Sequence, residues 1–261
     1  MNDWRKYWRE ILAVAQRILT ELARRRRSLI FWTIFPILLL LLNGTILASR
    51  ANLETAAAYG QAAPVTLVGA ALFFSCLGGS VATVVSEREH QTLKRLFLSP
   101  LSGISYFLGI FLAHSAIGFG QAFLIGGIAA ALGAEFKGSW LLGGIIILLS
   151  ILAYVGVGFI LGTQFARRTE DVNALVAAFG VPLLILGGTF LPASLFPDSL
   201  LRLAKFDPIY HMNEAMLNVA ANGSTLSDIA GHFQFLLLFA LAMVIAGGLS
   251  YARMLQQERR L

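Results

Sequence analysis

Six long stretches of the chain contain no Asp, Glu, Lys or Arg, and they limit its possible folds more than any other feature. They cover residues 28–49, 55–86, 96–134, 138–166, 172–197 and 229–252. Each is longer than the about 20 residues with which a helix crosses about 30 Å of hydrocarbon. Only 13% of the residues are charged, compared with about 25% in soluble domains. This pattern excludes a soluble globular enzyme, a disordered chain and a coiled coil, and the single cysteine excludes a disulfide scaffold.

We therefore predict an all-α membrane protein with six transmembrane helices, because open strands would leave backbone groups unpaired in lipid. The predicted spans are residues 29–48, 65–85, 104–132, 140–161, 172–191 and 233–251. Residues 1–28 form a preceding cytoplasmic segment, and residues 29–261 form the transmembrane domain. A cleaved signal peptide is the alternative for the first span, but the segment before it is too long for one.

The distribution of basic residues predicts the orientation. With a cytoplasmic N-terminus, the cytoplasmic segments hold 16 of the 20 Lys and Arg residues and 8 of the 14 acids. The net charge is then +8 inside (16 − 8) and −2 outside (4 − 6). Cytoplasmic loops are normally the positive ones. We therefore expect both termini in the cytoplasm, and we interpret the basic excess as a sign of topology and not of nucleic-acid binding.

An amphipathic helix is predicted over residues 2–27. Its apolar residues recur at i, i+3 and i+4, and they are Trp4, Tyr7, Trp8, Ile11, Leu12, Ala15, Ile18, Leu19 and Leu22. Such a helix lies in the membrane interface, where the arginines at 24–27 would contact anionic lipid. Docking of a partner on this helix is an additional possibility.

A second short helix is predicted on the cytoplasmic side, over residues 86–100. Ser86 and Glu89 have the spacing of a capping box, and Pro100 would end the helix. Leu93, Leu96 and Phe97 would share one face. We expect its alternating acids and bases to lie on an exposed face that suits a polar protein partner. The alternative is a solvated loop helix on the membrane surface.

Residues 192–226 are too polar and too interrupted by prolines to span the membrane. We predict two short helices, over about 198–205 and 209–221, that re-enter the membrane from the outer face. Such backbone is tolerated at membrane depth only where it packs on protein or lines a cavity. The alternative, an outer loop, would leave Leu200, Leu201, Leu203, Ile209, Met212, Met216 and Leu217 facing water.

The chain lacks the usual signs of catalysis. It has no phosphate-binding G-x-x-x-x-G-K-[ST] loop, no cluster of metal ligands and no Ser/His/Asp arrangement in one compartment. His114 is the only histidine inside a span, and we expect it to pack near Ser115 and Gln121 and not to relay protons. We expect no catalytic residue and no bound metal or cofactor. An intramembrane transferase is the alternative from another class, with Asp207 and Glu214 as its only nearby pair of carboxylates.

Two blocks of the sequence resemble the permeases of ABC-2 type transporters, the membrane subunits of bacterial exporters. The first block is Glu87-Arg88-Glu89-x-x-Thr92-Leu93-x-x-Leu96-x-x-Ser99-Pro100, which is similar to the cytoplasmic loop of that family. The second block runs from Gly187-Gly188 through Pro192 and Pro197 to Asp207-Pro208-Ile209-Tyr210 and Glu214. Asp207 stands where the family usually has Asn.

The resemblance implies a role for each block. Residues Glu87, Arg88, Glu89, Thr92, Leu93, Leu96, Phe97, Ser99 and Pro100 would form a coupling helix that contacts the ATPase. Residues Gly188, Pro192, Pro197, Asp207, Pro208, Tyr210 and Glu214 would form an outer gate. ATP and Mg²⁺ would bind to a separate ABC ATP-binding subunit, present twice per complex. A second permease subunit, identical or different, would complete the transporter in the bacterial cytoplasmic membrane.

The substrate is inferred only as a class. Without fixed charges in the spans, a path through the protein favours an amphipathic or lipid-like molecule such as a drug, lipid or glycolipid. Export of a lipid-linked polysaccharide is the alternative. Glycines are frequent in the predicted spans, and we interpret most of them as sites of close helix packing, with some at a dimer interface.

Overall fold

The computed structural model describes residues 3–24, 26–90 and 101–258, and these residues form helices joined by short loops, with no strand among them. The α-helices are α1 (Asp3–Arg24), α2 (Arg26–Arg50), α3 (Thr55–Val65), α4 (Gly79–Glu89), α6 (Gly103–Ala131), α7 (Trp140–Ile160), α8 (Thr169–Leu175), α9 (Val181–Leu186), α10 (Asp198–Ala204), α11 (Pro208–Asn222) and α12 (Ala230–Glu258). Short π-helical segments join some of them into longer rods, namely η1 (Thr66–Ala71), η2 (Phe73–Gly78), η3 (Leu161–Phe165) and η4 (Val176–Gly180). A single 3-10 turn, η5 (Ala193–Leu195), precedes α10.

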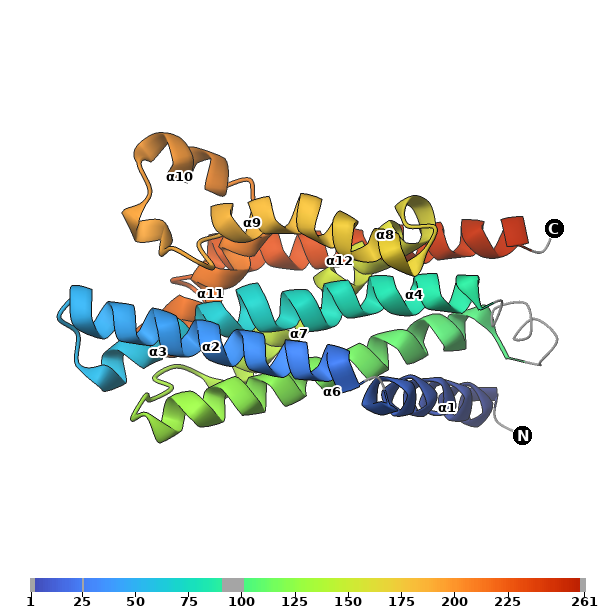
Figure 1. The fold of residues 1–261 in the computed structure, drawn as a ribbon, viewed down its shortest axis with the longest axis horizontal. Coiled ribbons are helices and arrows are strands. Elements are labelled where there is room, and N and C mark those ends of the chain that lie inside the picture. Colours follow the sequence, from blue (N-terminus) through green and yellow to red (C-terminus); the bar gives the residue numbers. More distant parts are fainter. Residues whose placement is uncertain (1–2, 25, 91–100, 259–261) are drawn as a thin grey trace.

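Six of the described helical rods are long and apolar enough to cross a membrane, as the sequence predicted. They are Arg26–Arg50, Thr55–Glu89, Gly103–Ala131, Trp140–Phe165, Thr169–Leu186 and Ala230–Gln256. Five of them begin or end several residues from the predicted limits. Four of these are longer than predicted, whereas Thr169–Leu186 begins earlier and ends five residues before residue 191. The rods run along the long axis of the molecule (Figure 1). Helix α1 and the end of α12 lie at one end, called here the terminal end, and α10 lies at the opposite end, called here the far end.

The rod from α3 to α4 is the most enclosed of the six. Pro64, inside α3, has no N–H to continue the helical hydrogen-bond ladder. The π-helical segments η1 and η2 follow directly after it. One carbonyl in this irregular region, that of Val68, accepts a hydrogen bond from the Tyr154 hydroxyl at 3.0 Å. A side chain from α7 thus satisfies backbone in the middle of the bundle.

Helices α7 and α12 approach each other closely through two glycines. A Cβ at Gly156 would lie 2.6 Å from the backbone of Met243, and one at Gly247 would lie 2.9 Å from the Gly156 carbonyl oxygen. No larger side chain fits at either place. Small residues allow such contact in membranes, where lipid offers no hydrophobic drive for helix association. These two positions therefore follow the expectation that glycine serves packing.

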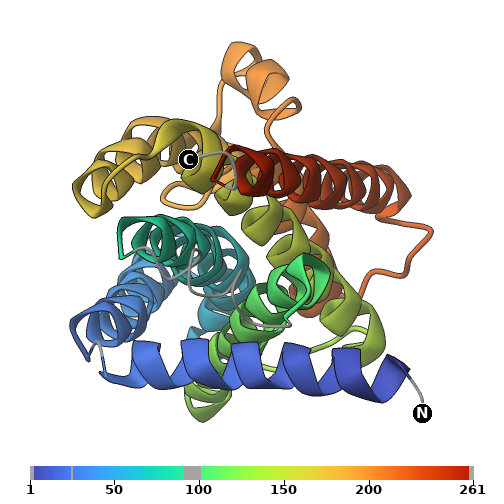
Figure 2. The ribbon, with the colours of Figure 1, turned by 90° about the vertical axis from the view of Figure 1, so that its right-hand side faces the viewer.

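Helix α1 lies across the terminal end of the bundle, perpendicular to the long rods (Figure 2). One face is buried, with Ile11, Val14 and Ile18 in the hydrophobic core. Val14 packs on α6 at Gly109, where a Cβ would come within 2.6 Å of it. The aromatic residues Trp4 and Trp8 remain exposed. The apolar face of α1 is therefore partly buried against the protein and partly exposed at its aromatic residues.

Helices α10 and α11 agree closely with the two short helices predicted before the last span. Helix α11 is largely buried, with Met212, Ala215 and Val219 fully inside the protein. It contacts α3, α7 and α12. Helix α10 projects from the far end beside α9 (Figure 1), and its Leu203 is exposed. Of the two helices, α11 is thus the one that belongs to the core.

Candidate functional site

The last turn of α4 carries Glu87, Arg88 and Glu89, called here the Glu87–Glu89 cluster. Helix α4 runs without a break from Gly79 to Glu89, and His90 is its C-cap. The prediction that Ser86 begins a new helix with a capping box is therefore wrong. Ser86 is instead a residue of the last turn, and its carbonyl oxygen lies 2.8 Å from the ring nitrogen of His90. The remaining residues of the predicted coupling helix, Thr92, Leu93, Leu96, Phe97, Ser99 and Pro100, lie outside the described residues.

Glu87 forms an ion pair with Arg17 of α1. Its side chain is only 5% exposed, whereas that of Arg17 is 31% exposed. We expected the acids of this segment to face a partner, and for Glu87 this is wrong, because its carboxylate is enclosed within its own chain. A buried carboxylate needs a charged or hydrogen-bonding partner, and Arg17 provides it. The pair connects α1 to the end of α4.

Arg88 contacts the end of the rod formed by α7 and η3. Its guanidinium donates to the carbonyl oxygens of Gly162 at 3.2 Å, Thr163 at 3.4 Å and Ala166 at 3.2 Å. The last carbonyls of a helix have no partner within the helix, and a cation near that end also complements the helix dipole. Arg88 therefore caps a neighbouring rod at its C-terminal end.

Glu89 contacts the start of α8. Its carboxylate accepts a hydrogen bond from the Thr169 amide at 3.2 Å and another from the Thr169 hydroxyl. A carboxylate at the N-terminus of a helix satisfies a free amide and complements the positive end of the dipole. In contrast to Glu87, Glu89 is exposed. The three charged residues therefore join α4 to three different elements, α1, the α7 rod and α8.

The far end of the α8–α9 rod turns back through Gly188. This glycine has a positive φ of 79°, a backbone conformation that is costly for residues with a side chain. Its amide donates to the Ile185 carbonyl at 3.1 Å, and the next amide, that of Thr189, donates to Leu184 at 3.0 Å. These bonds end the helix, and Pro192 follows before η5 begins. Helix α9 therefore ends at Leu186, before the predicted limit of residue 191, and we call residues 187–192 the α9 turn.

Asn213 of α11 holds the α9 turn, and the sequence analysis did not identify it. Its side-chain amide donates to the Gly187 carbonyl at 2.9 Å and to the Thr189 hydroxyl at 3.1 Å. Asn43 of α2 also donates to the Thr189 carbonyl, at 3.4 Å. Asn213 is almost fully buried. Of the three asparagines in α11, Asn213 shares a helix face with the apolar Ile209 and Met216. This position was the available signal, because a buried amide requires partners.

Asp207 begins α11. Its carboxylate accepts a hydrogen bond from the Ile209 amide at 2.9 Å, and Pro208 occupies the first turn of the helix. Burial raises the pKa of Asp207 to about 7, and the hydrogen bond from Ile209 opposes that shift. Pro197 is the N-cap residue of α10, as Asp207 is of α11, but the Pro197 side chain makes no capping hydrogen bond.

The other predicted gate residues lie on α11 as well. Tyr210 is buried in a small apolar cluster with Ala193, Phe196 and Ala204, which fastens α10 and η5 to α11. Glu214 contacts its own helix through the Asn218 side chain at 3.5 Å. Burial raises the pKa of Glu214, and the bond from Asn218 opposes this. In the structure Asp207 and Glu214 each bond within α11, which does not favour a catalytic pair.

His114 is a packed histidine, as expected, but its partners differ from the expected ones. The ring is fully buried, with one nitrogen 3.2 Å from the Ser75 carbonyl and the other 3.5 Å from the Thr83 hydroxyl. Gln121 instead donates to the Trp32 carbonyl at 3.1 Å. Within the described ranges, no group of three or more His, Cys, Asp or Glu side chains could hold a metal ion.

The N-cap at Asp207 leads to a prediction of pH-dependent stability. Because burial raises the pKa from its ordinary 3.8 to about 7, ionisation of Asp207 costs more in the folded protein than in the unfolded chain. The stabilising contribution is complete below about pH 4 and is lost as the pH rises through about 7. Asp207→Asn keeps the cap and should remove this dependence. Asp207→Ala also removes the ionisable group, and because it lacks the cap it should be about 0.5–2 kcal/mol less stable than Asp207→Asn at every pH.

Thermal unfolding of the purified protein between pH 5 and 8.5 measures both effects. The wild type should lose stability across this range, and the Asn variant should have a flatter profile. Parallel profiles for wild type and Asp207→Asn would show that Asp207 does not titrate in this way.

Comparison with known proteins gives one family and two relatives. Residues 49–249 match the family model described as ABC-2 family transporter protein. YvfS of Bacillus subtilis (strain 168), provisionally named a transport permease, is 25% identical over 176 residues, which are 64% of this chain and 71% of YvfS. The linearmycin resistance permease protein LnrN of the same organism is 25% identical over 184 residues. That alignment covers 67% of this chain and 45% of LnrN, so the chain spans less than half of that relative.

Proposed function

Because the chain belongs to the ABC-2 family of transporter proteins, we propose that it is the permease subunit of an ATP-binding-cassette exporter. Two copies of a separate ATP-binding subunit hydrolyse ATP, and a second permease subunit, identical or different, completes the complex. The terminal end faces the cytoplasm of a bacterium, and the membrane is the cytoplasmic one. The observation that supports this proposal best is the Glu87–Glu89 cluster, which joins three elements at that end.

The cluster suggests how a movement of the ATPase reaches the spans. The partner acts on the segment that follows α4 and displaces the last turn of that helix. Glu89 passes the displacement to Thr169 at the start of the α8–α9 rod, whose other end is the α9 turn. Asn213 connects this turn to α11. One rod therefore extends from the proposed coupling site to the proposed outer gate.

The cargo in this proposal is an amphipathic or lipid-like molecule. LnrN is named for resistance to linearmycin, which supports export of a small compound more than export of a lipid-linked polysaccharide. The six candidate spans carry their charged residues near the helix ends, and this suits a cargo without strong charge. The transferase alternative receives less support, because Asp207 and Glu214 both have structural hydrogen bonds.

The test of the function is reconstitution with an ATPase. The chain is co-expressed with the ABC ATP-binding subunit encoded nearest to its gene, purified and placed in lipid vesicles. We expect the two proteins to copurify and amphipathic compounds to stimulate ATP hydrolysis and ATP-dependent transport. If the chain copurifies with no ATPase and adds no transport to the vesicles, the proposed function is wrong.

Orientation leads to a prediction of its own. Single cysteines at Glu54, Lys137 and Asn222, all exposed, should react with an impermeant thiol reagent outside intact cells. Cysteines at Glu89 and Arg168 are equally exposed but should react only after the cells are opened. The background variant is Cys76→Ser, and Cys76 is buried in any case. Labelling of position 89 in sealed cells would reverse the orientation and remove the cytoplasmic coupling site with it.

A further inference from the structure

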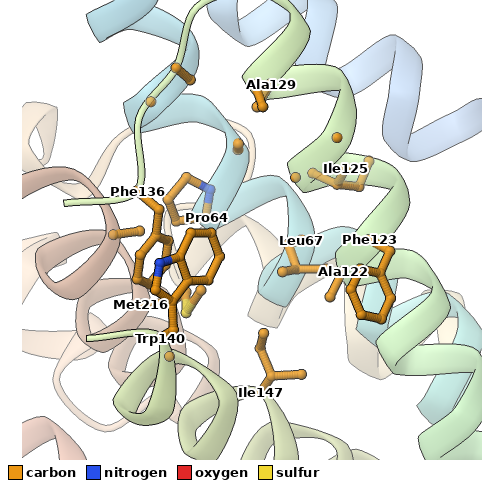
Figure 3. A pocket seen from close by; sticks show the side chains of 18 of the residues that line it. Pro64, Leu67, Ala122, Phe123, Ile125, Ala129, Phe136, Trp140, Ile147 and Met216 are labelled. Atoms are coloured by element: carbon orange, nitrogen blue, oxygen red, sulfur yellow. The ribbon is translucent and has the colours of Figure 1, made fainter. Parts of the chain in front are cut away.

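A cavity of about 600 Å³ lies between the rod of α3 and η1, α6, α7 and α11 (Figure 3). Its volume is within the about 300–1,000 Å³ typical of ligand sites. Most of its lining is apolar, including Leu67, Phe123, Ile147 and Met216, and Glu135 is the one charged residue in it. Protein interiors rarely leave such a volume empty. The cavity therefore requires an occupant that is mainly hydrocarbon.

Glycines create this space without serving helix packing. A Cβ built on Gly126 or Gly127 of α6, or on Gly144 of α7, would meet no atom within 4 Å. A Cβ built on Gly143, by contrast, would lie 2.8 Å from the nearest carbon of the Phe136 ring. These first three positions are therefore not among the packing sites that we predicted for most glycines of the spans. Their missing side chains leave room for something outside the chain.

The cavity opens sideways, towards the surroundings of the bundle. Phe123 and Trp140 line it and are 80% and 75% exposed. Both belong to helices that are candidate membrane spans, so the medium at this opening is the bilayer. Trp140 stacks on Phe136 with 4.2 Å between ring centroids at the first turn of α7. Tryptophan is typical of the membrane interface, which places the headgroup of a bound lipid near this turn.

We propose that this cavity binds an acyl chain of a bilayer lipid, drawn from the leaflet at the far end. Water is excluded as the occupant, because a stable buried water needs about three hydrogen-bonding partners and the walls are apolar. The deep lining includes Met216 and Ala220 of α11. A bound chain therefore packs directly against the helix that carries Asn213. This inference depends on the membrane location and not on the transport function.

Photochemical labelling tests the proposal. The purified protein is reconstituted with phosphatidylethanolamine that carries a diazirine near the end of one acyl chain, irradiated and analysed by peptide mass spectrometry. Met216 and Ile147 are only 4% and 8% exposed, so a chain reaches them only through the cavity. We expect adducts at these two residues as well as at the exposed Phe123.

Matched variants distinguish a specific site from general lipid contact. Gly126→Leu and Gly144→Leu fill the cavity, and the open space at these positions should allow both to fold. Gly120→Leu is the control, because Gly120 also meets nothing within 4 Å but does not line the cavity. Labelling of Met216 and Ile147 should fall at least about fivefold in the two filling variants and remain unchanged in the control.

Two results would overturn the proposal. In the wild type, adducts at exposed residues alone would show that no acyl chain enters. Equal labelling of Met216 in the wild type and both filling variants would show that the label arrives by another route. Labelling requires neither ATP nor the ATPase, so failure of the transport proposal leaves this result unaffected.

Discussion

Arg17→Gln should destabilise the protein by about 3 kcal/mol. The substitution leaves the carboxylate of Glu87 buried without its charged partner, and breaking a buried pair in this way costs about 3–5 kcal/mol. The lower figure applies because Arg17 is about one third exposed. The double variant Arg17→Gln/Glu87→Gln removes both charges and should be more stable than Arg17→Gln alone. Thermal unfolding of these two variants, of Glu87→Gln and of the wild type measures the interaction as a double-mutant cycle.

The matched control for this cycle is Arg9→Gln, which removes an exposed charge from the same helix. It should change stability by less than about 0.5 kcal/mol, as surface substitutions usually do. If Arg17→Gln lowers the stability as little as Arg9→Gln does, the ion pair does not hold α1 on the bundle.

Gly188→Leu should reduce transport by about tenfold or more while leaving membrane insertion intact. The positive φ of Gly188 is costly for leucine, and its Cβ would lie 3.2–3.3 Å from Ala193. The α9 turn must then shift, and with it the contact to Asn213. Gly188→Asn should be much milder, because Asn tolerates the left-handed conformation. Transport into inverted vesicles and the amount of protein in the membrane are the two measurements.

Gly120→Leu is again the control, since it makes the same chemical change at a helical position with open space around it. It should transport normally. Normal transport by Gly188→Leu as well would mean that the turn has no part in the exit of the cargo.

Local sequence signals predicted the elements whose structure depends on nearby residues. The uncharged windows predicted the six candidate spans, and the amphipathic period predicted α1. Asp207 followed by Pro208 predicted the start of α11, because an N-cap and a proline in the first turn act within a few residues. The α9 turn was not predicted in this way, because the predicted span continued to residue 191, whereas α9 ends at Leu186.

Contacts between distant residues could not be predicted from such signals. The Glu87 carboxylate was expected at an exposed face, but its partner Arg17 is 70 positions away and brings it into the interior. Arg88 and Glu89 likewise contact elements 74 to 80 positions further along the chain. A serine followed three residues later by a glutamate suggested that a helix starts at Ser86. In the structure Ser86 lies near the end of α4, which begins at Gly79. Tertiary packing decided these cases.

The role of each glycine also could not be predicted from the local sequence. Their number suggested close packing, and Gly156 and Gly247 do bring α7 against α12. Gly126 and Gly144 look no different in the sequence, yet they border open space. Which glycine packs and which leaves a cavity depends on how neighbouring helices are placed, and that information is absent from the local pattern.

The central claim is that the Glu87–Glu89 cluster transmits ATPase movement to the spans, and the ratio of cargo transported to ATP hydrolysed tests it most directly. This ratio is measured in reconstituted vesicles for the wild type, for Glu87→Gln/Glu89→Gln, and for Glu170→Gln, which alters an exposed carboxylate in the first turn of α8. We predict that the double variant still copurifies with the ATPase and hydrolyses ATP, but with a ratio at least about fivefold lower. The Glu170 variant should match the wild type. An unchanged ratio in the double variant would contradict the claim and leave the cluster a purely structural set of contacts.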